Sequence, residues 1–231
     1  YYQNTPYPYL ELERQFLGPS EIGSLFLSPK FRNKKVGRLL SLSRFLFIHS
    51  FDEFFTRTII AELRGYLFKN NVSPIWNAIG KKFIRTSFHN ADINASKDID
   101  FIEKKFPKKP IYLNLLPKNS IKYFQQVHPF TEPAKILLLK EGFKVMNQVD
   151  IFDGGPTLEC SVKNIRTIKQ AKKIKVSNLE KRIKNKNYLI CNHSLKQFTV
   201  MKINKNTKIN AIKEKLSVTN NDLITIVEEA S

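Results

Sequence analysis

Leu25-Phe-Leu-Ser-Pro-Lys-Phe-Arg-Asn-Lys-Lys-Val-Gly-Arg-Leu-Leu40 is the stretch of this 231-residue chain that decides its fold class. Its apolar start belongs to a β-prone run over residues 21–28, and Pro29 ends that run. A basic loop follows, and then a run over residues 37–55 in which apolar side chains occupy nearly every helical face. A helix of this kind is typically buried between layers. The stretch therefore predicts a strand, a loop and a buried helix in an α/β or α+β fold.

The loop between this strand and this helix is a candidate anion site. The N-terminus of a helix presents unpaired N–H groups and the positive end of the helix dipole, which together bind phosphate. Gly37 would let a ligand approach the backbone closely, and Arg32 and Arg38 add positive charge. A basic loop before a helix is more often a plain solvated turn, so the loop alone leaves both interpretations open.

Apolar alternation and turn residues predict the remaining elements. A strand over residues 7–14 is expected to form a hairpin with the strand over residues 21–28. Further strands are expected over residues 58–63, 81–88, 143–152 and 157–162, and further helices over residues 73–79, 98–105 and 131–141. A Pro-rich segment over residues 106–117 is expected on the surface. Short strands over residues 188–192, 198–203 and 223–227 predict a small β-rich C-terminal unit.

Composition excludes several classes of protein. Hydrophobic residues make up 42% and aromatic residues 12% of the chain, which suits a globular core and not a disordered chain. No apolar run is long enough for a bilayer, so we expect no membrane association. Cys160 and Cys191 are the only cysteines, and no Cys/His cluster has ligand spacing, so we expect no metal and a reducing cytoplasm. The chain starts at Tyr1 with no targeting signal after it, which we interpret as a cut N-terminus.

The net charge of +19 invites a nucleic-acid interpretation. Most basic residues are lysines, as in A- and T-rich genomes, and the long basic run over residues 163–186 has no aromatic side chains to stack on bases. We therefore expect a solvated face with a flexible linker, and no nucleic-acid partner. A basic RNA-binding module stays as an alternative, and RNA binding at low salt would reveal it.

The basic loop resembles the coenzyme A pyrophosphate loop of the GNAT acyltransferases, whose usual pattern is Arg/Gln-x-x-Gly-x-Gly/Ala. Arg32 and Gly37 fit this pattern after the apolar strand, and Lys35 stands where the first glycine is expected. The run Ala134-Lys-Ile-Leu-Leu-Leu-Lys-Glu-Gly-Phe143 resembles the fourth helix and following strand of the same fold. The resemblance implies a GNAT-like sheet flanked by helices.

Several longer runs are similar to the arginine N-succinyltransferase family, from about Pro8 to Lys169. The most distinctive is Val149-Asp-Ile-Phe-Asp-Gly-Gly-Pro-Thr-Leu-Glu-Cys160. The other runs are residues 21–27, 37–45, 60–65, 73–76 and 126–129. The resemblance implies a succinyl-CoA-dependent acyltransferase of arginine catabolism, which transfers succinyl to the α-amino group of L-arginine or L-ornithine. No metal is implied.

The resemblance also implies roles for individual residues. Leu25 falls on the family's succinyl-CoA contact, and the pantetheine amides could pair with extended backbone from Leu25 to Leu27. His128, in the Val-His-Pro motif, falls on the family's proton-transfer residue, and histidine is the residue type that most readily exchanges protons near neutral pH. On the residues alone, His128 could instead fix the loop before the helix over residues 131–141.

Other titratable residues carry weaker signals. Asp150, Asp153 and Glu159 could bind a guanidinium through charge-assisted hydrogen bonds. Their positions around two glycines are explained equally well if they are turn and strand-end residues. Cys160 has no base near it in sequence, so we expect a buried thiol, and we expect a structural role for His49 on the buried helix.

The expected organisation is a GNAT-like domain over residues 1–170 and a small β-rich domain over residues 171–231. Members of this family carry a further N-terminal region before the part that matches Tyr1, so we expect the N-terminal part of the fold to be absent. The alternative function is therefore a non-catalytic or truncated subunit that needs a partner chain. A homo-oligomer and a hetero-oligomer both stay open.

Overall fold

The computed structural model describes residues 7–13, 18–32, 36–98 and 100–229. The chain divides into two compact units, each discontinuous in sequence. Unit 1 combines Tyr1–Gly18, Ile60–Ile136 and Lys144–Glu159, and unit 2 combines Pro19–Ile59, Leu137–Phe143 and Cys160–Ser231. The expected boundary after residue 170 divides the chain linearly instead, and it stays a prediction.

A four-stranded sheet has the order β2-β3-β6-β5. Its strands are β2 (Ser20–Glu21), β3 (Thr58–Glu62), β6 (Pro156–Ser161) and β5 (Lys144–Val149). β5 and β6 are antiparallel with Lys144 opposite Glu159, and an irregularity interrupts their register before Val149. Because β6 is buried along most of its length, it is a central strand, as its position in the order requires.

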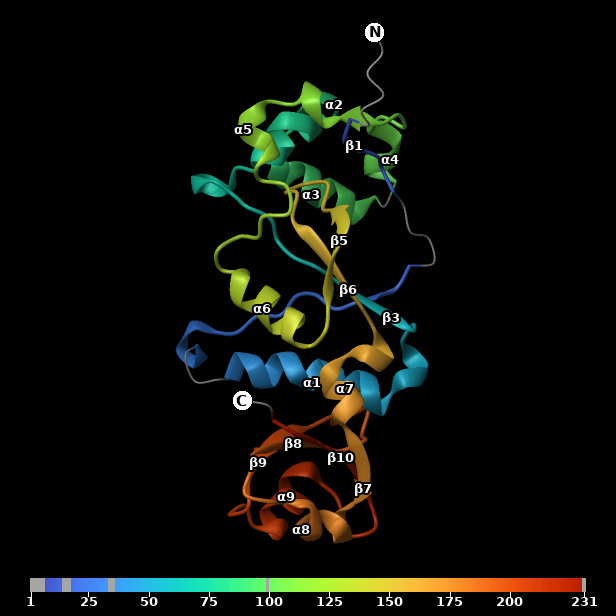
Figure 1. Cartoon of the computed structure of the whole chain (residues 1–231), viewed down its shortest axis with the longest axis vertical. Helices are drawn as coiled ribbons and strands as arrows, with labels where there is room; N and C mark the ends of the chain where they lie inside the picture. The colour runs from blue at the N-terminus through green and yellow to red at the C-terminus, as the bar shows by residue number, and fades with distance from the viewer. Residues whose placement is uncertain (1–6, 14–17, 33–35, 99, 230–231) are drawn as a thin grey trace. The chain divides into compact units, whose positions relative to one another are not determined.

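Short helices make up much of unit 1 (Figure 1). They are η3 (Lys69–Asn71), η4 (Trp76–Gly80), α2 (Lys81–Phe83), α3 (Phe88–Lys97), α4 (Phe101–Lys105), η5 (Leu113–Leu115) and α5 (Lys118–Ile121). Trp76 is buried, stacks on Phe152 at 5.5 Å between ring centroids, and donates from Nε1 to the Thr86 carbonyl at 3.0 Å. Ser73 caps this segment, because its hydroxyl accepts the Trp76 N–H at 2.9 Å and donates to the Phe152 carbonyl at 2.8 Å. This cap fixes Trp76 against the turn after β5.

Unit 2 is organised around α1 (Val36–Ser50), the helix that the apolar run predicts. η1 (Pro29–Phe31) precedes α1 and η2 (Asp52–Phe54) follows it. Phe45 and Leu46 are fully buried, and the Phe45 ring lies 5.8 Å from that of Phe143. α6 (Glu132–Lys140) ends one residue before the buried Glu141, and η6 (Val162–Asn164) and α7 (Arg166–Gln170) follow β6. α1 packs against α7.

The C-terminal part of unit 2 has its own antiparallel sheet, with the order β7-β10-β8-β9. Its elements are β7 (Lys172–Lys175), η7 (Val176–Asn178), α8 (Leu179–Arg182), β8 (Tyr188–Cys191), β9 (Val200–Ile203), α9 (Ile209–Leu216) and β10 (Leu223–Glu228). α8 and α9 lie over the same face of this sheet (Figure 1). They share one core with alternate residues of the strands, such as Ile190 and Ile224. Leu189 and Cys191 are buried on the opposite face, where the Cys191 thiol lies 3.7 Å from the Ser50 hydroxyl of α1. Both faces of the sheet are therefore covered.

The predicted N-terminal hairpin is wrong. β1 (Tyr9–Leu10) pairs with β4 (Ile111–Tyr112), a strand inside the segment that we expected only on the surface. The Tyr9 and Tyr112 rings meet at 6.1 Å, and the Leu113 N–H donates to the Pro8 carbonyl at 2.9 Å. A pairing that joins residues about 100 positions apart leaves no local signal, whereas the turn at Gly18-Pro19 suggested a local partner.

The predicted strand over residues 81–88 is also wrong. Lys81–Phe83 continue the helical segment from η4, and Ser87 then caps α3 by accepting the Asn90 N–H at 3.2 Å. The run has apolar residues at spacings that suit either a strand or a helix, and the packing of Phe83 against Phe106 and of Phe88 against Phe152 favours the helices.

Candidate functional site

The segment expected to bind the acyl donor lies in unit 2 and is mostly not a strand. β2 comprises Ser20–Glu21 and so contains only Glu21 of the predicted run over residues 21–28, which makes that prediction wrong for most of its length. Leu25 is 38% exposed, Phe26 is 71% exposed, and Leu27 is half-buried. Ser24 has φ of 53°, which interrupts an extended backbone. The backbone at Leu25 and Leu27 is therefore outside a strand ladder.

The basic loop turns tightly after Ser28. The Ser28 carbonyl accepts the Phe31 N–H at 2.9 Å, and the Pro29 carbonyl accepts the Arg32 N–H at 3.1 Å. The Arg32 side chain donates from Nε to the Leu27 carbonyl at 3.2 Å. This bond holds the guanidinium group beside the loop backbone, where its terminal N–H groups can meet an anion. Lys35 lies outside the described residues.

α1 begins at Val36, one residue before the predicted start, and runs for 15 residues. Its first turn contains Gly37 and Arg38 and no acidic side chain, so no carboxylate of the first turn competes for the free N–H groups. A Cβ atom on Gly37 would meet the Leu27 side chain at 3.4 Å, an ordinary contact. Gly37 is therefore not required by the packing of this loop, and its lack of a side chain leaves room for a ligand.

His128 lies in unit 1, at the start of the turn that leads into α6. Its ring Nδ1 accepts the Phe130 N–H at 3.2 Å, and its carbonyl accepts the Thr131 N–H at 2.7 Å. Because Nδ1 is an acceptor in this bond, the neutral ring carries its proton on Nε2. The ring is half-buried and lies 5.2 Å from the 89% exposed Phe130 ring. The side chain thus both fixes a loop amide and presents a proton-bearing nitrogen.

Two backbone hydrogen bonds hold the segment before His128 in place. The His128 N–H donates to the Arg64 carbonyl at 2.9 Å, next to an antiparallel bridge between Gly65 and Val127. The Gln125 N–H donates to the Gly154 carbonyl at 2.8 Å. Three runs that the sequence presents separately, around residues 60–65, 126–129 and 149–160, therefore meet at one place in unit 1.

The third of these runs is a tight turn held by two aspartates. Asp150 Oδ1 accepts the N–H groups of Phe152 at 2.8 Å and Asp153 at 2.9 Å. Asp153 Oδ1 accepts the Gly155 N–H at 2.9 Å. Gly154 has φ of +72°, which is the left-handed region that favours glycine. These bonds give Asp150 and Asp153 the structural role that we weighed against guanidinium binding.

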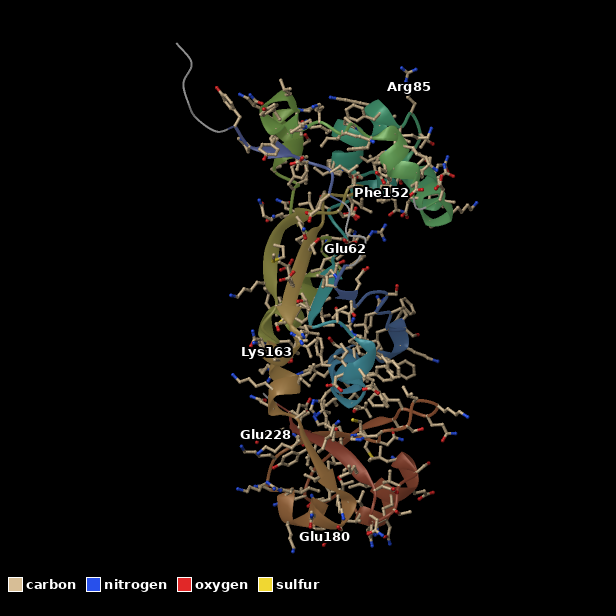
Figure 2. The ribbon with its side chains drawn as sticks, turned by 90° about the vertical axis from the view of Figure 1, so that its right-hand side faces the viewer. Glu62, Arg85, Phe152, Lys163, Glu180 and Glu228 are labelled. Carbon is tan, nitrogen blue, oxygen red and sulfur yellow. The ribbon has the colours of Figure 1, made fainter. Side chains whose placement is uncertain are left out.

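Burial raises the pKa of Asp150 to about 7. The neighbouring carboxylate of Asp153 adds to the rise, and Glu62 adds less, whereas the two backbone N–H bonds act in the opposite direction. Figure 2 labels Glu62 on β3 and Phe152 in the turn. The folded chain therefore holds the Asp150 proton more tightly than the unfolded chain does. As the pH rises from about 4 to 7 this proton is lost, and the free energy of unfolding decreases.

Asp150→Asn is therefore expected to stabilise the chain at pH 8 by about 1–3 kcal/mol and to leave it nearly unchanged at pH 4. Asn keeps an oxygen that can accept both backbone N–H groups but removes the buried negative charge. Urea unfolding of both proteins at pH 4, 6 and 8 measures the difference, in which titrating groups that do not interact with Asp150 cancel. Asp150→Ala, which removes the acceptor, is expected to destabilise at every pH. An Asn variant that is less stable than the wild type at pH 8 would refute the ionisation argument.

The other titratable residues that the sequence singles out lie within packed parts of the fold and are explained by packing. Cys160 is buried and its thiol lies 3.5 Å from the Ser161 carbonyl, and Glu159 is half-buried on β6. Burial and the nearby charge of Lys173 lower the pKa of His49, whose ring Nε2 is buried without a hydrogen-bond partner. Burial chiefly raises the pKa of Cys191 to about 11, which keeps this thiol protonated and unreactive.

Residues 7–13, 18–32, 36–98 and 100–229 contain no group of three or more His, Cys, Asp or Glu side chains placed to hold a metal ion. Within the same ranges, no helix combines the length and the apolar character that a membrane crossing requires.

Sequence reasoning missed the residues that support His128. Arg64 and Gly65 supply the backbone that the His128 segment pairs with, and Gln125, at φ of 60°, also donates from Nε2 to the Met146 carbonyl at 3.1 Å. The runs that contain Arg64, Gly65 and Gln126 were recognised, but only as family resemblance. Nothing in their spacing indicated that they would meet.

Comparison with known proteins gives three findings. The family model described as arginine N-succinyltransferase beta subunit matches residues 2–167. Arginine N-succinyltransferase of Escherichia coli O6:H1 is 41% identical over 171 residues, which is 74% of this chain and 50% of that relative. The enzyme of the same name from Escherichia coli O1:K1 matches to the same extent. The chain thus spans about half the length of the curated relatives it matches.

A solved structure, that of arginine/ornithine succinyltransferase subunit AI from Pseudomonas aeruginosa, is also similar. The TM-score is 0.76 at 26% identity, over 91% of this chain and 63% of that one. This likeness confirms the expected GNAT-like α/β fold. A match over 91% of the chain must include part of the region after residue 167, where the family model ends.

Proposed function

Because the chain belongs to the arginine N-succinyltransferase beta subunit family, we propose that it acts in transfer of a succinyl group from succinyl-CoA to the α-amino group of L-arginine or L-ornithine. This is a step of arginine catabolism, and we place it in the cytoplasm. The observation that carries the proposal is the convergence of the Arg64-Gly65, Val127-His128 and Gly154 backbones around a half-buried histidine.

The donor is assigned to unit 2. The pantetheine amides of succinyl-CoA would pair with the backbone at Leu25 and Leu27, which is outside a strand ladder. The diphosphate would bind the first-turn N–H groups of α1, with Arg32 and Arg38 beside it. Arg32 suits this role because its bond to the Leu27 carbonyl places the guanidinium at the loop.

The reaction needs two proton movements. The neutral α-amino nitrogen attacks the thioester carbonyl, the C–S bond breaks, and the amide nitrogen loses a proton while the thiolate gains one. His128 is assigned to the second movement. The proton that the amine loses would first convert the neutral ring into an imidazolium, with Nδ1 releasing the Phe130 N–H, and the imidazolium would then give its Nε2 proton to the thiolate and return to the neutral state. The hydrogen bond at Nδ1 also fixes the ring's orientation.

Thiol release from succinyl-CoA tests the proposed activity. The full chain with succinyl-CoA and L-arginine is expected to release coenzyme A in an arginine-dependent manner, and L-ornithine in place of L-arginine ranks the two acceptors. Leaving out the amino acid gives the background of hydrolysis. Release that does not depend on either amino acid would reject the enzymatic function.

A second candidate is a non-catalytic or truncated subunit that needs another polypeptide. The chain covers about half of the length of the curated relatives, and this share favours the second candidate. This function predicts no arginine-dependent release by the chain alone, and release once a polypeptide with the sequence of the relatives' unmatched half is added. Activity of the chain alone would reject this candidate.

His128→Ala is expected to lower kcat by roughly 10²-fold if the ring delivers the proton. KM for succinyl-CoA is expected to change much less, because the substitution removes none of the proposed contacts with succinyl-CoA. His89→Ala is the matched control, since His89 is an exposed histidine on α3 that belongs to no motif. Unchanged kcat in a folded His128→Ala protein would leave the residue only its role in fixing the Phe130 amide.

A further inference from the structure

The face of the C-terminal sheet that packs on α1 carries a row of polar side chains. Lys173 of β7 lies opposite Thr225 of β10, and Thr225 lies opposite Cys191 of β8. Because side chains alternate along a strand, these three point away from the core that α8 and α9 share with the sheet. The Cys191 thiol lies 3.7 Å from the Ser50 hydroxyl of α1. The contact between α1 and this row, here called the seam, therefore lies within unit 2 and is polar.

Two histidines border the seam, one from each side. His49 lies on α1 next to Ser50, and its ring Nε2 is buried without a hydrogen-bond partner among the described residues. His193 follows β8, and its ring Nε2 lies 2.8 Å from the Thr225 hydroxyl. Both rings are half-buried, and the charge of one would act on the other. Neither histidine has a place in the proposed reaction.

The surroundings of these rings oppose their protonation. Burial lowers the pKa of both His49 and His193, and the nearby ammonium group of Lys173 lowers it further. Asp52, which follows α1, acts on His49 in the opposite direction, but its effect is the smallest of the three. A neutral pair of rings therefore suits the closed seam, and a charged pair does not.

The other charged residues of the elements around the rings are mostly cations. They are Arg44 of α1, Glu53 of η2, Arg166 and Lys169 of α7, Lys175 of β7, Lys196 between β8 and β9, and Lys202 of β9. Arg166 pairs with Glu141, and Lys202 pairs with Glu229. A proton taken up by either histidine thus adds charge to a positive neighbourhood.

We propose that the seam is an acid-sensitive contact, closed while both histidines are neutral and opened when they take up protons. An imidazolium has N–H donors at both nitrogens, so protonation of His49 would leave a charged donor at a buried position without an acceptor. In the open form both rings regain the ordinary pKa of histidine, about 6.5. Because that value is higher than in the closed form, proton uptake favours opening as the pH falls below about 6.5. The proposal does not depend on the acyltransferase function.

Packing and net charge explain part of this arrangement without a switch. A neutral histidine can serve as a core side chain, and a chain with a net charge of +19 loses stability in acid through general repulsion. Neither explanation distinguishes the seam from other buried parts of unit 2. The proposal adds that opening is local, and the two cysteines can report it. Cys191 is buried in the seam, whereas Cys160 is buried on β6.

Reaction of the full chain with 4,4′-dithiodipyridine, followed by peptide mass mapping, tests the proposal. Each thiol's rate is divided by its rate in the urea-unfolded chain at the same pH, which removes the pH dependence of the reagent chemistry. Between pH 7.5 and pH 5 the relative rate of Cys191 is expected to rise at least 10-fold, and that of Cys160 less than about 2-fold. A constant Cys191 rate, or a parallel rise at both cysteines, would overturn the proposal.

A pair of lysine variants tests the electrostatic cause. Lys173→Gln removes the cation next to both rings, so the rise in the Cys191 rate is expected to be at least 3-fold smaller. Lys172→Gln is the matched control, because it removes the same charge from the same strand on the opposite face of the sheet. Equal rises in the two variants would contradict the assigned role of Lys173 and overturn the proposal.

A double variant tests the histidines themselves. In His49→Leu/His193→Gln the leucine cannot be protonated, and the glutamine amide keeps a partner for the Thr225 hydroxyl. The relative rate of Cys191 is expected to change less than about 2-fold between pH 7.5 and pH 5. A wild-type rise in the folded double variant would overturn the proposal, and if this variant does not fold, the lysine pair decides.

Discussion

Gly155→Ala is expected to destabilise unit 1 by more than about 3 kcal/mol or to prevent its folding. A Cβ atom on Gly155 would lie 1.9 Å from the Leu63 carbonyl oxygen and 2.6 Å from the Gly65 nitrogen. Both are backbone atoms, and Leu63 also donates its N–H to the Pro156 carbonyl at 3.1 Å, so neither can move without breaking the pairing of β3 with β6. The substitution should therefore separate these strands at the turn.

Fluorescence of Trp76, the chain's single tryptophan, reports this unit directly. Trp76 is buried and stacks on Phe152, two residues before the turn glycines, so its emission should shift to longer wavelength and its urea midpoint should fall. Gly23→Ala is the matched control, since its Cβ would meet only the flexible Glu21 side chain at 3.4 Å. A Gly155→Ala protein with the wild-type midpoint would contradict the backbone contact.

The same substitution should reduce activity if the proposed function holds. The Gly154 carbonyl accepts the Gln125 N–H, three residues before His128, so displacement of the turn reaches the histidine through this bond. Residual folded protein is therefore expected to show a lower kcat than the Gly23→Ala control.

Elements with a strong periodic pattern were predicted well from sequence. The helices α1 and α6 and the strands β3, β5 and β6 occur close to the expected residues, because long apolar patterns and clear stop signals such as Gly142 determine them locally. The end of α1 at Ser50, five residues earlier than predicted, follows from the switch to η2 at Asp52. Helix ends depend on tertiary packing that the local pattern does not contain.

The short elements were predicted poorly because tertiary contacts, and not local preference, stabilise them. β1 has two residues and exists through its pairing with β4, and α9 was missed although its apolar residues Ile212 and Leu216 lie in the C-terminal core. A chain segment that needs a distant partner shows only ambiguous spacing in the sequence.

The candidate site was predicted as separate residues and not as an arrangement. His128 and the two turn glycines were identified by resemblance, but the bonds from His128 to Arg64 and from Gln125 to Gly154 join backbone atoms. Backbone pairing leaves little trace in side-chain identity, so the meeting of these runs could be seen only in the structure. The two aspartates show the same limit, since their carboxylates hold the turn amides while the residue types alone also suit guanidinium binding.

Glu141→Ala is expected to destabilise unit 2 by about 3–5 kcal/mol, the cost of breaking a buried ion pair from one side. The Glu141 side chain is only 2% exposed, pairs with the Arg166 guanidinium, and accepts the Thr167 N–H at 2.8 Å through its other oxygen. Alanine would leave the arginine without its carboxylate and the first turn of α7 without its acceptor. The junction of α6 with α7 should loosen as a result.

Urea unfolding followed by circular dichroism measures this loss, with two controls. Glu141→Gln keeps an acceptor for Thr167 but removes the charge, so it is expected to lose less than the alanine variant. Lys104→Ala breaks an exposed ion pair, in which the Lys104 side chain is 62% exposed and the Asp98 side chain is 48% exposed. It should lower the free energy of unfolding by less than about 1 kcal/mol. If Glu141→Ala cost no more than Lys104→Ala, the carboxylate would not be a structural anchor of α7. A large loss in alanine together with a partial loss in glutamine would instead show that both the hydrogen bond and the charge of Glu141 stabilise the junction.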